Sequence, residues 1–204
     1  MKFLWYSGCY GLLLLASGML AGCSGGDDVD VPVDNAEDVS ALRNLGAKLE
    51  FNEAGRVKRV VFSAPRAEDA ASMPNGEAAS PLGVSDDDLK HLAGLPGLSV
   101  LELWSPRITD AGLVHLAKLK NLTSLDLMQT RVTDNGLDHL SGLERLKTLN
   151  LYGTLVSDDG IEKLASLSHL ETLDVSETQI TEQGCESLKR KMPNTKIWRR
   201  EPRR

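Results

Sequence analysis

Residues 122–137, LTSLDLMQTRVTDNGL, decide the fold because nearly the same string stands 24 residues earlier, at 98–113, and 24 residues later, at 146–161. The pattern Leu-x-x-Leu-x-Leu begins at Leu98, Leu122 and Leu146, and with Val in its last place at Leu170. A degenerate copy, Val-x-x-Val-x-Phe, begins at Val57. A fixed period in the twenties predicts one small unit of secondary structure per repeat, stacked on its neighbours.

Each repeat predicts a short strand followed by a helix. Alternate residues are apolar in x-Leu-x-Leu-x, the period of a strand with one buried face. The spacing then changes to three at Leu137, Leu140 and Leu143, which suits a helix with one apolar stripe.

The start of each helix repeats three features of its own. A hydroxyl side chain in the N-cap position precedes an acid in the first turn, where anions are favourable. A glycine follows, which predicts a close approach of the helix to the strand layer. The hydroxyl residues are Thr109, Thr133, Ser157 and Thr181; the acids are Asp110, Asp134, Asp158 and Glu182; the glycines are Gly112, Gly136, Gly160 and Gly184.

This repeat resembles the leucine-rich repeats, in the T-x-V-T-D-x-G-L form of bacterial members, over roughly Val57 to Trp198. The resemblance implies an α/β solenoid with a parallel β-sheet on the concave face, helices on the convex face and a continuous leucine core. Many family members carry Asn after the strand, where this chain has Pro106, Thr130, Thr154 and Thr178. Functions tied to the Asn form are therefore not carried over.

The repeats, 84–198, lie between segments of different composition. Residues 35–62 predict an N-terminal cap made of a helix and a hairpin, and 63–83, rich in Ala, Ser, Pro and Gly, predict a flexible insertion loop. A last strand is expected at 196–198, after Pro193 ends the final helix. Residues 199–204 form a basic tail.

The first 22 residues have the layout of an export signal, with Lys2 before an apolar run. The run ends at Leu20-Ala21-Gly22-Cys23, which resembles the lipobox of bacterial lipoproteins and implies cleavage before Cys23 and lipidation of its sulfur. An acidic linker, 23–34, follows. Acyl chains would anchor the protein outside the cytoplasm; Ser24 favours the outer membrane over the inner. The alternative is a plain signal peptide or a short transmembrane anchor.

No residue pattern predicts catalysis, a metal or a cofactor. His91, His115 and His139 share one repeat position, but they come from neighbouring helices about 8–10 Å apart, too far for shared zinc coordination. Cys185 stands where other repeats have Leu or Ile, so a buried thiol is expected. The chain is not expected to be an enzyme or to bind a small-molecule substrate. A net charge of -6 argues against nucleic acid.

The face of the sheet opposite the leucines carries the candidate binding residues. One row contains Glu102, Asp126, Asn150 and Asp174, and the next contains Trp104, Met128, Tyr152 and Ser176. Exposed apolar groups beside acids predict a site for a protein or peptide that offers an apolar group and cations. Alternatively, these side chains pack on each other or under 63–83.

These features predict a membrane-anchored envelope lipoprotein whose repeats form a non-catalytic protein-binding or scaffold module. The alternative is a structural envelope component that self-associates, or that contacts the cell wall or anionic lipid through its basic C-terminal end.

Overall fold

The computed structural model describes residues 34–62 and 83–200, all within one compact unit, Pro32–Arg204. The expected signal peptide, Cys23, nearly all of the acidic linker and the insertion loop, and the last four residues lie outside the described residues. Among the described helices, none combines the length and the apolar character that crossing a membrane requires.

A helix and a β-hairpin form the N-terminal end of the solenoid, and the hairpin supplies the first two strands of the sheet. α1 (Ala36–Asn44) begins after Asn35, whose side-chain oxygen accepts a hydrogen bond from a first-turn N–H at 2.9 Å. Gly46 follows the helix with a φ of 83°, which glycine adopts at little cost. β1 (Lys48–Phe51) then pairs antiparallel with β2 (Val57–Phe62). The helix and the hairpin expected from the sequence are both present.

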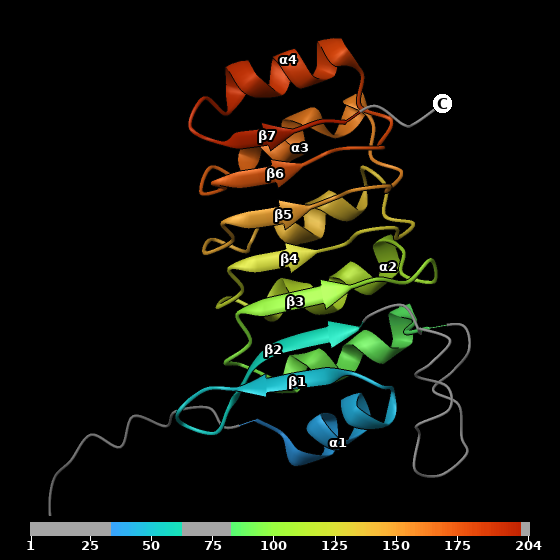
Figure 1. The fold of residues 1–204 in the computed structure, drawn as a ribbon, viewed down its shortest axis with the longest axis vertical. Helices are drawn as coiled ribbons and strands as arrows, with labels where there is room; N and C mark the ends of the chain where they lie inside the picture. The colour runs from blue at the N-terminus through green and yellow to red at the C-terminus, as the bar shows by residue number, and fades with distance from the viewer. Residues whose placement is uncertain (1–33, 63–82, 201–204) are drawn as a thin grey trace, which may run out of the picture. The chain divides into compact units, whose positions relative to one another are not determined.

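The repeats add five strands to this hairpin in chain order, and all five run parallel to β2. They are β3 (Val100–Leu103), β4 (Ser124–Asp126), β5 (Thr148–Asn150), β6 (Thr172–Asp174) and β7 (Lys196–Trp198). The register follows the sequence period, so Leu101 pairs with Leu125 and Leu125 with Leu149. Figure 1 shows the strands stacked one above another with the repeat helices behind them. The predicted fold class, an α/β solenoid with a parallel sheet, is confirmed.

The helical layer consists of short segments, many of them 3-10 helices (η). They are η2 (Asp86–Gly94), α2 (Asp110–Leu113), η3 (Val114–Lys118), η4 (Gly136–Leu140), η5 (Asp158–Gly160), α3 (Ile161–Ser166) and α4 (Glu182–Lys191). A strict leucine spacing of three matches the three residues per turn of a 3-10 helix. The buried side chains of Cys185 and Leu188 in α4 and of Met192 at its C-cap are spaced by three and four, as in an α-helix.

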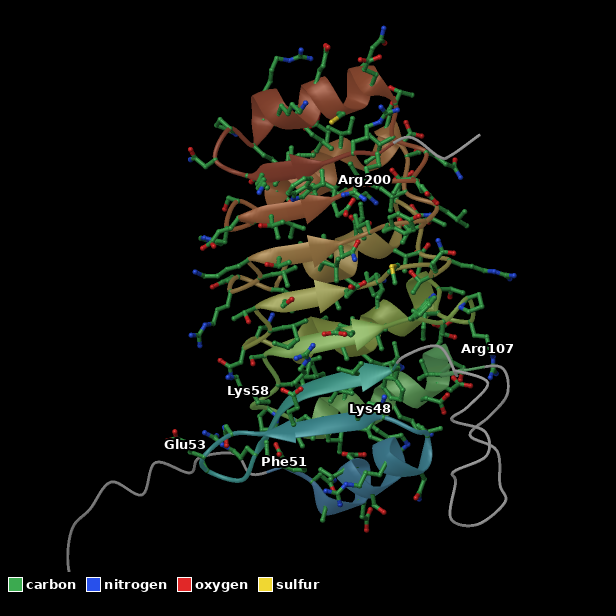
Figure 2. The ribbon with its side chains drawn as sticks, viewed as in Figure 1. Lys48, Phe51, Glu53, Lys58, Arg107 and Arg200 are labelled. Atoms are coloured by element: carbon green, nitrogen blue, oxygen red, sulfur yellow. The ribbon has the colours of Figure 1, made fainter. Side chains whose placement is uncertain are left out.

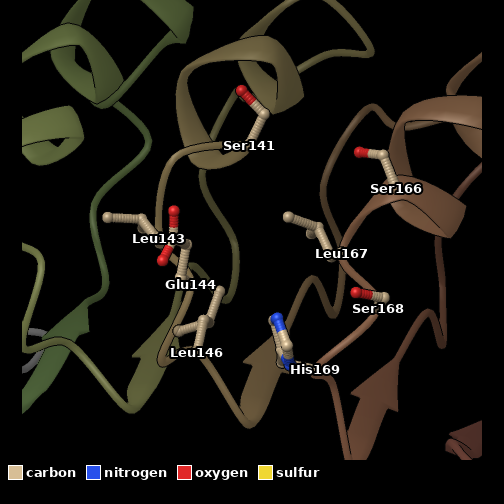
Figure 3. A pocket seen from close by; sticks show the side chains of 8 residues that line it. All are labelled: Ser141, Leu143, Glu144, Leu146, Ser166, Leu167, Ser168 and His169. Carbon is tan, nitrogen blue, oxygen red and sulfur yellow. The ribbon is translucent and has the colours of Figure 1, made fainter.

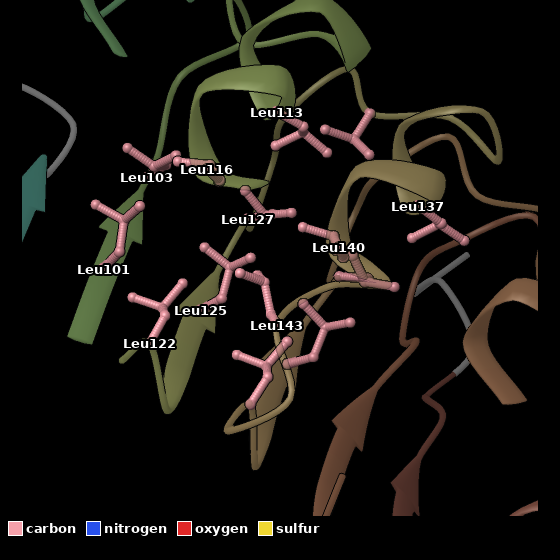
Figure 4. Packing of buried hydrophobic residues seen from close by; sticks show 14 of the residues in the cluster. Leu101, Leu103, Leu113, Leu116, Leu122, Leu125, Leu127, Leu137, Leu140 and Leu143 are labelled. Atoms are coloured by element: carbon pink, nitrogen blue, oxygen red, sulfur yellow. The ribbon is translucent and has the colours of Figure 1, made fainter. Parts of the chain in front are cut away.

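The leucines of both layers form one core between the sheet and the helices. Leu101, Leu125, Leu149 and Leu173 have no exposed surface. Figure 4 shows Leu125 and Leu127 meeting Leu140 and Leu143 of the helical side. Each fully buried leucine contributes about 1.5–3 kcal/mol. Because each coil packs on the next, the core is continuous along the stack.

The acids at the helix starts join each repeat to the next one. Each carboxylate accepts the backbone N–H of a residue 23 positions later at 2.7–2.9 Å and its hydroxyl at 2.6–2.7 Å. The pairs are Asp86 with Thr109, Asp110 with Thr133, Asp134 with Ser157, and Asp158 with Thr181. We call this series the aspartate ladder. The hydroxyls of Thr109, Ser157 and Thr181 also cap their own helices, as expected from the sequence. Thr133 does not, because η4 begins after Asn135, which corrects that prediction.

The repeated glycines make room for this ladder, which corrects the prediction that they approach the strand layer. A Cβ added at Gly136 would lie 2.4 Å from Asp110 Oδ1 and 3.0 Å from side-chain carbons of Leu113 and Val132. Gly112, Gly160 and Gly184 meet the preceding aspartate in the same way. The close neighbour is therefore the adjacent repeat's helix start.

The threonines that follow β4, β5 and β6 each make a local hydrogen bond to the backbone. The hydroxyls of Thr130, Thr154 and Thr178 donate to the carbonyl oxygen three residues earlier at 2.7–2.8 Å. In the first repeat, Ser105 donates to the Val84 carbonyl oxygen at 2.6 Å. These bonds satisfy buried backbone carbonyl groups by hydroxyl side chains, without the side-chain amides that Asn would supply.

Candidate functional site

The candidate site is the sheet face turned away from the helices, here called the open face. The strand register aligns Glu102 with Asp126, Asp126 with Asn150, and Asn150 with Asp174. These four residues are the acidic row. Trp104, Met128, Tyr152 and Ser176 follow two positions later and are the apolar row. Adjacent members of the acidic row are about 4.8 Å apart because that is the strand spacing. The members of the apolar row lie just past the strand ends.

Backbone hydrogen bonds hold the acidic row in place. Asp126 Oδ1 accepts the Met128 N–H at 2.8 Å, and Asn150 and Asp174 make the equivalent bonds to Tyr152 and Ser176. The Asn150 side chain also donates to Asp126 Oδ2 at 3.0 Å. The row is therefore oriented before any partner binds, which lowers the entropic cost of recognition.

The charges of the acidic row are balanced at one end only. Arg59 Nη2 lies 2.5 Å from Glu102 Oε1, and this hydrogen bond and charge raise the pKa of Arg59. Among the described residues, no cation forms an ion pair with Asp126 or Asp174. Burial raises the pKa of Asp126, and the charges of Glu102 and Asp174 add to it, against two hydrogen bonds. The middle of the row is thus anionic and uncompensated.

The apolar row is less uniform than the sequence suggests. Trp104 is 42% exposed, whereas Met128 and Tyr152 are half-buried. Ser176 is buried and accepts the Arg200 N–H at 2.8 Å, so it offers no contact surface. Figure 2 labels Arg200, which continues the chain beyond β7. The exposed part of the row is therefore at its Trp104 end.

The sequence analysis did not include Trp198 or Arg59 among the residues of the open face. Trp198 is 43% exposed and pairs in register with Asp174, so it extends the acidic row by one aromatic residue. Lys196 Nζ lies 4.3 Å from the Trp198 ring centroid, a cation–π contact. The repeat period points to position 198, but Arg59, which neutralises Glu102, lies in the degenerate copy and gives no such signal.

The residues considered for chemistry lie apart from the open face. His91 Nδ1 is 2.7 Å from Asp38 Oδ1, which ties α1 to η2. Cys185 is buried, as predicted. Within the described ranges, no cluster of His, Cys, Asp and Glu could hold a metal ion.

A pocket of about 230 Å³ lies beside the loops that precede β5 and β6. Figure 3 shows Glu144 and His169 there with three serines. Ser141 and Ser166 donate to backbone carbonyls, and no hydrogen bond recorded among the described residues joins His169 to a serine or to Glu144. The pocket therefore lacks the nucleophile–base contact of a hydrolytic site.

The repeats match a protein-family model, and the chain is similar to several solved structures. The family model "Leucine Rich repeat" matches residues 118–141 and 166–189. No curated protein matches the chain.

The solved structures found include an internalin of Listeria monocytogenes and the ectodomain of the receptor kinase SOBIR1 of Arabidopsis thaliana. The internalin is 24% identical over 57% of this chain and 32% of its own, with a TM-score of 0.46. The receptor ectodomain is 20% identical over 83% of this chain and 94% of its own, with a TM-score of 0.48. A leucine-rich-repeat protein of Leptospira interrogans is 18% identical over 53% and 33%, with a TM-score of 0.38.

The 24-residue register, the parallel sheet and the matched repeats together identify the fold of this chain as a leucine-rich-repeat solenoid.

Proposed function

We propose that the chain is a non-catalytic module that binds a protein or peptide on its open face. The observation that carries this proposal is the exposed Trp104 together with the fixed carboxylates of Asp126 and Asp174, with which no described cation pairs. Large aromatic residues contribute most of the binding energy in many protein interfaces. Since the helices lie on the other side of the sheet (Figure 1), a partner can reach these side chains without rearranging the core.

Site-specific photo-crosslinking in the native cells tests this proposal. A photoreactive amino acid replaces Met128 on the open face or, as a control, Glu186, which is exposed on α4. We expect a discrete crosslinked product from position 128 and none from position 186. A product from position 186 alone would place the binding surface on the helical side.

We further propose that Cys23 carries a lipid that anchors the protein in the bacterial envelope, with the outer membrane favoured. The support is the sequence Leu20-Ala21-Gly22-Cys23 after an apolar run. Two or more acyl chains give stable anchoring without a membrane-spanning helix.

Metabolic labelling with an alkyne fatty acid tests the anchor. Cys23→Ala should lose the label and move to the soluble fraction, whereas the control Cys9→Ala should keep both label and membrane location. A label that persists in Cys23→Ala would exclude lipidation at this residue.

A second function is self-association through the C-terminal end of the solenoid. The exposed Trp198 and Lys196 on the last strand of the sheet favour it. Sedimentation of the purified chain distinguishes the two functions. A monomer supports the binding module, and a dimer that Trp198→Ala dissociates supports self-association.

A further inference from the structure

We infer that the partner is an extended cationic segment in the polyproline II conformation, with positive side chains at every third residue, lying along the acidic row. This inference rests on the proposed function and specifies the chemistry of its partner. It follows from the charge, the spacing and the neighbours of Asp126 and Asp174.

The charge of the row selects a cationic partner. Asp126 and Asp174 alternate with the amide of Asn150, and no described cation pairs with either carboxylate. Asp174 Oδ1 accepts the Ser176 N–H, and no hydrogen bond is recorded to its Oδ2 among the described residues. Arg59 already pairs with Glu102, so the unbalanced charge is confined to two points.

The spacing of these two points selects the partner's conformation. Asp126 and Asp174 are two strands apart, which is about 9.6 Å at the usual strand spacing. A polyproline II helix has three residues per turn and rises 3.1 Å per residue, so side chains three apart point the same way about 9.3 Å apart. In a β-strand, side chains on one face repeat every two residues, or about 6.7 Å. The polyproline II repeat therefore matches the row and the strand repeat does not.

The apolar row supplies the second contact that such a segment needs. Trp104, Met128 and Tyr152 come two residues after Glu102, Asp126 and Asn150, just beyond the ends of β3, β4 and β5. Proline-rich segments bind surfaces lined with aromatic side chains, where their rings pack against the aromatic faces. Prolines between the cations would therefore meet the apolar row while the cations meet the carboxylates.

Two labelled peptides of one composition test the spacing. The first is Arg-Pro-Pro-Arg-Pro-Pro-Arg, and the second is Pro-Arg-Pro-Arg-Pro-Arg-Pro. Fluorescence anisotropy with the full chain measures both dissociation constants at about 0.1 M salt, where exposed charges still interact. We expect the first peptide to bind more tightly by up to about fivefold, the upper limit for one exposed ion pair. Equal affinities would overturn the inference.

Variants locate the binding. Asp174→Asn keeps an oxygen for the Ser176 N–H but removes one charge, and it should abolish the preference for the first peptide. Asp126→Asn should do the same. Asp159→Asn, an equal charge change at an exposed position of η5, should leave both dissociation constants unchanged. If Asp159→Asn weakens binding as much as Asp174→Asn, the effect is one of net charge and the inference is wrong.

The peptide affinities and the crosslinking result together show whether this inference or the proposed function fails. A crosslinked partner at position 128 together with equal peptide affinities retains the binding module and rejects the cationic segment. A spacing preference that persists in Trp104→Ala/Tyr152→Ala rejects the role of the apolar row. Failure of both the crosslink and the peptides rejects the open face altogether.

Discussion

The two faces of the sheet differ in how strictly their residue types recur from one repeat to the next. On the helical side, the same residue types recur in successive coils: leucine at 101, 125, 149 and 173, and aspartate at 86, 110, 134 and 158. On the open face, one position changes from Trp104 to Met128, Tyr152 and Ser176. Stacking demands identical contacts between coils, so the helical side holds the fold together. The open face is free of that demand and can carry specificity.

The largest expected effect comes from the core. Leu149 has no exposed surface, so Leu149→Ala should lower the free energy of unfolding by about 2–5 kcal/mol. Tyr152→Ala, three residues later on the open face, should cost clearly less because Tyr152 is only half-buried. Urea denaturation measures both. Equal losses would remove the distinction between the two faces.

The glycine beside the aspartate ladder should give the next largest effect. Gly136→Ala places a Cβ 2.4 Å from Asp110 Oδ1, against packed neighbours, and should cost about 1–3 kcal/mol. Gly142→Ala is the matched control, since its Cβ would meet only the flexible end of Lys120 at 2.8 Å. Thermal unfolding compares the two variants. A Gly136→Ala variant as stable as Gly142→Ala would mean that the ladder does not require this close approach.

The same substitution, Asp to Asn, should have small but different effects on stability on the two faces. Burial raises the pKa of Asp126, so the folded chain holds this proton more tightly than the unfolded chain. The resulting stability is present below about pH 3.9 and is lost as pH rises through the folded pKa. Asp126→Asn removes this penalty, but it also loses the hydrogen bond that Asn150 donates to Oδ2. The stability of the variant relative to the natural protein should therefore be higher at pH 7 than at pH 4, by less than about 1 kcal/mol.

Asp134→Asn provides the contrast on the helical side. Asp134 accepts both the N–H and the hydroxyl of Ser157, and an amide nitrogen in place of Oδ2 loses one of these bonds. The free energy of unfolding at pH 7 should fall by about 1 kcal/mol. Urea denaturation at pH 7 and pH 4 measures both variants. If the stability of Asp126→Asn relative to the natural protein does not rise between pH 4 and pH 7, the raised pKa of Asp126 is contradicted.

The sequence predicts most of the helical side because its contacts recur with the period. The strands, the buried leucines, three of the four N-caps and the buried Cys185 follow from spacing alone. The aspartate ladder was missed because an acid at a helix start already has a local explanation. That explanation gives no sign that Asp110 reaches Thr133 in the next coil.

The open face is only partly predictable because some of its contacts do not recur with the period. The period places its rows correctly, but exposure depends on neighbours outside the repeat. Ser176 is covered because Arg200 follows β7, and Glu102 is neutralised because Arg59 lies in the hairpin. The 24-residue spacing of the repeats cannot predict such contacts, because each joins a repeat to a segment outside the repeats.

The double variant Trp104→Ala/Tyr152→Ala tests the division between the faces most directly. One preparation serves for both the urea unfolding curve and the recovery of the partner crosslinked at position 128. The account predicts loss of the crosslinked product with the unfolding midpoint close to that of the natural protein. Recovery of the product at the natural level, from a folded double variant, would contradict the assignment of binding to the open face.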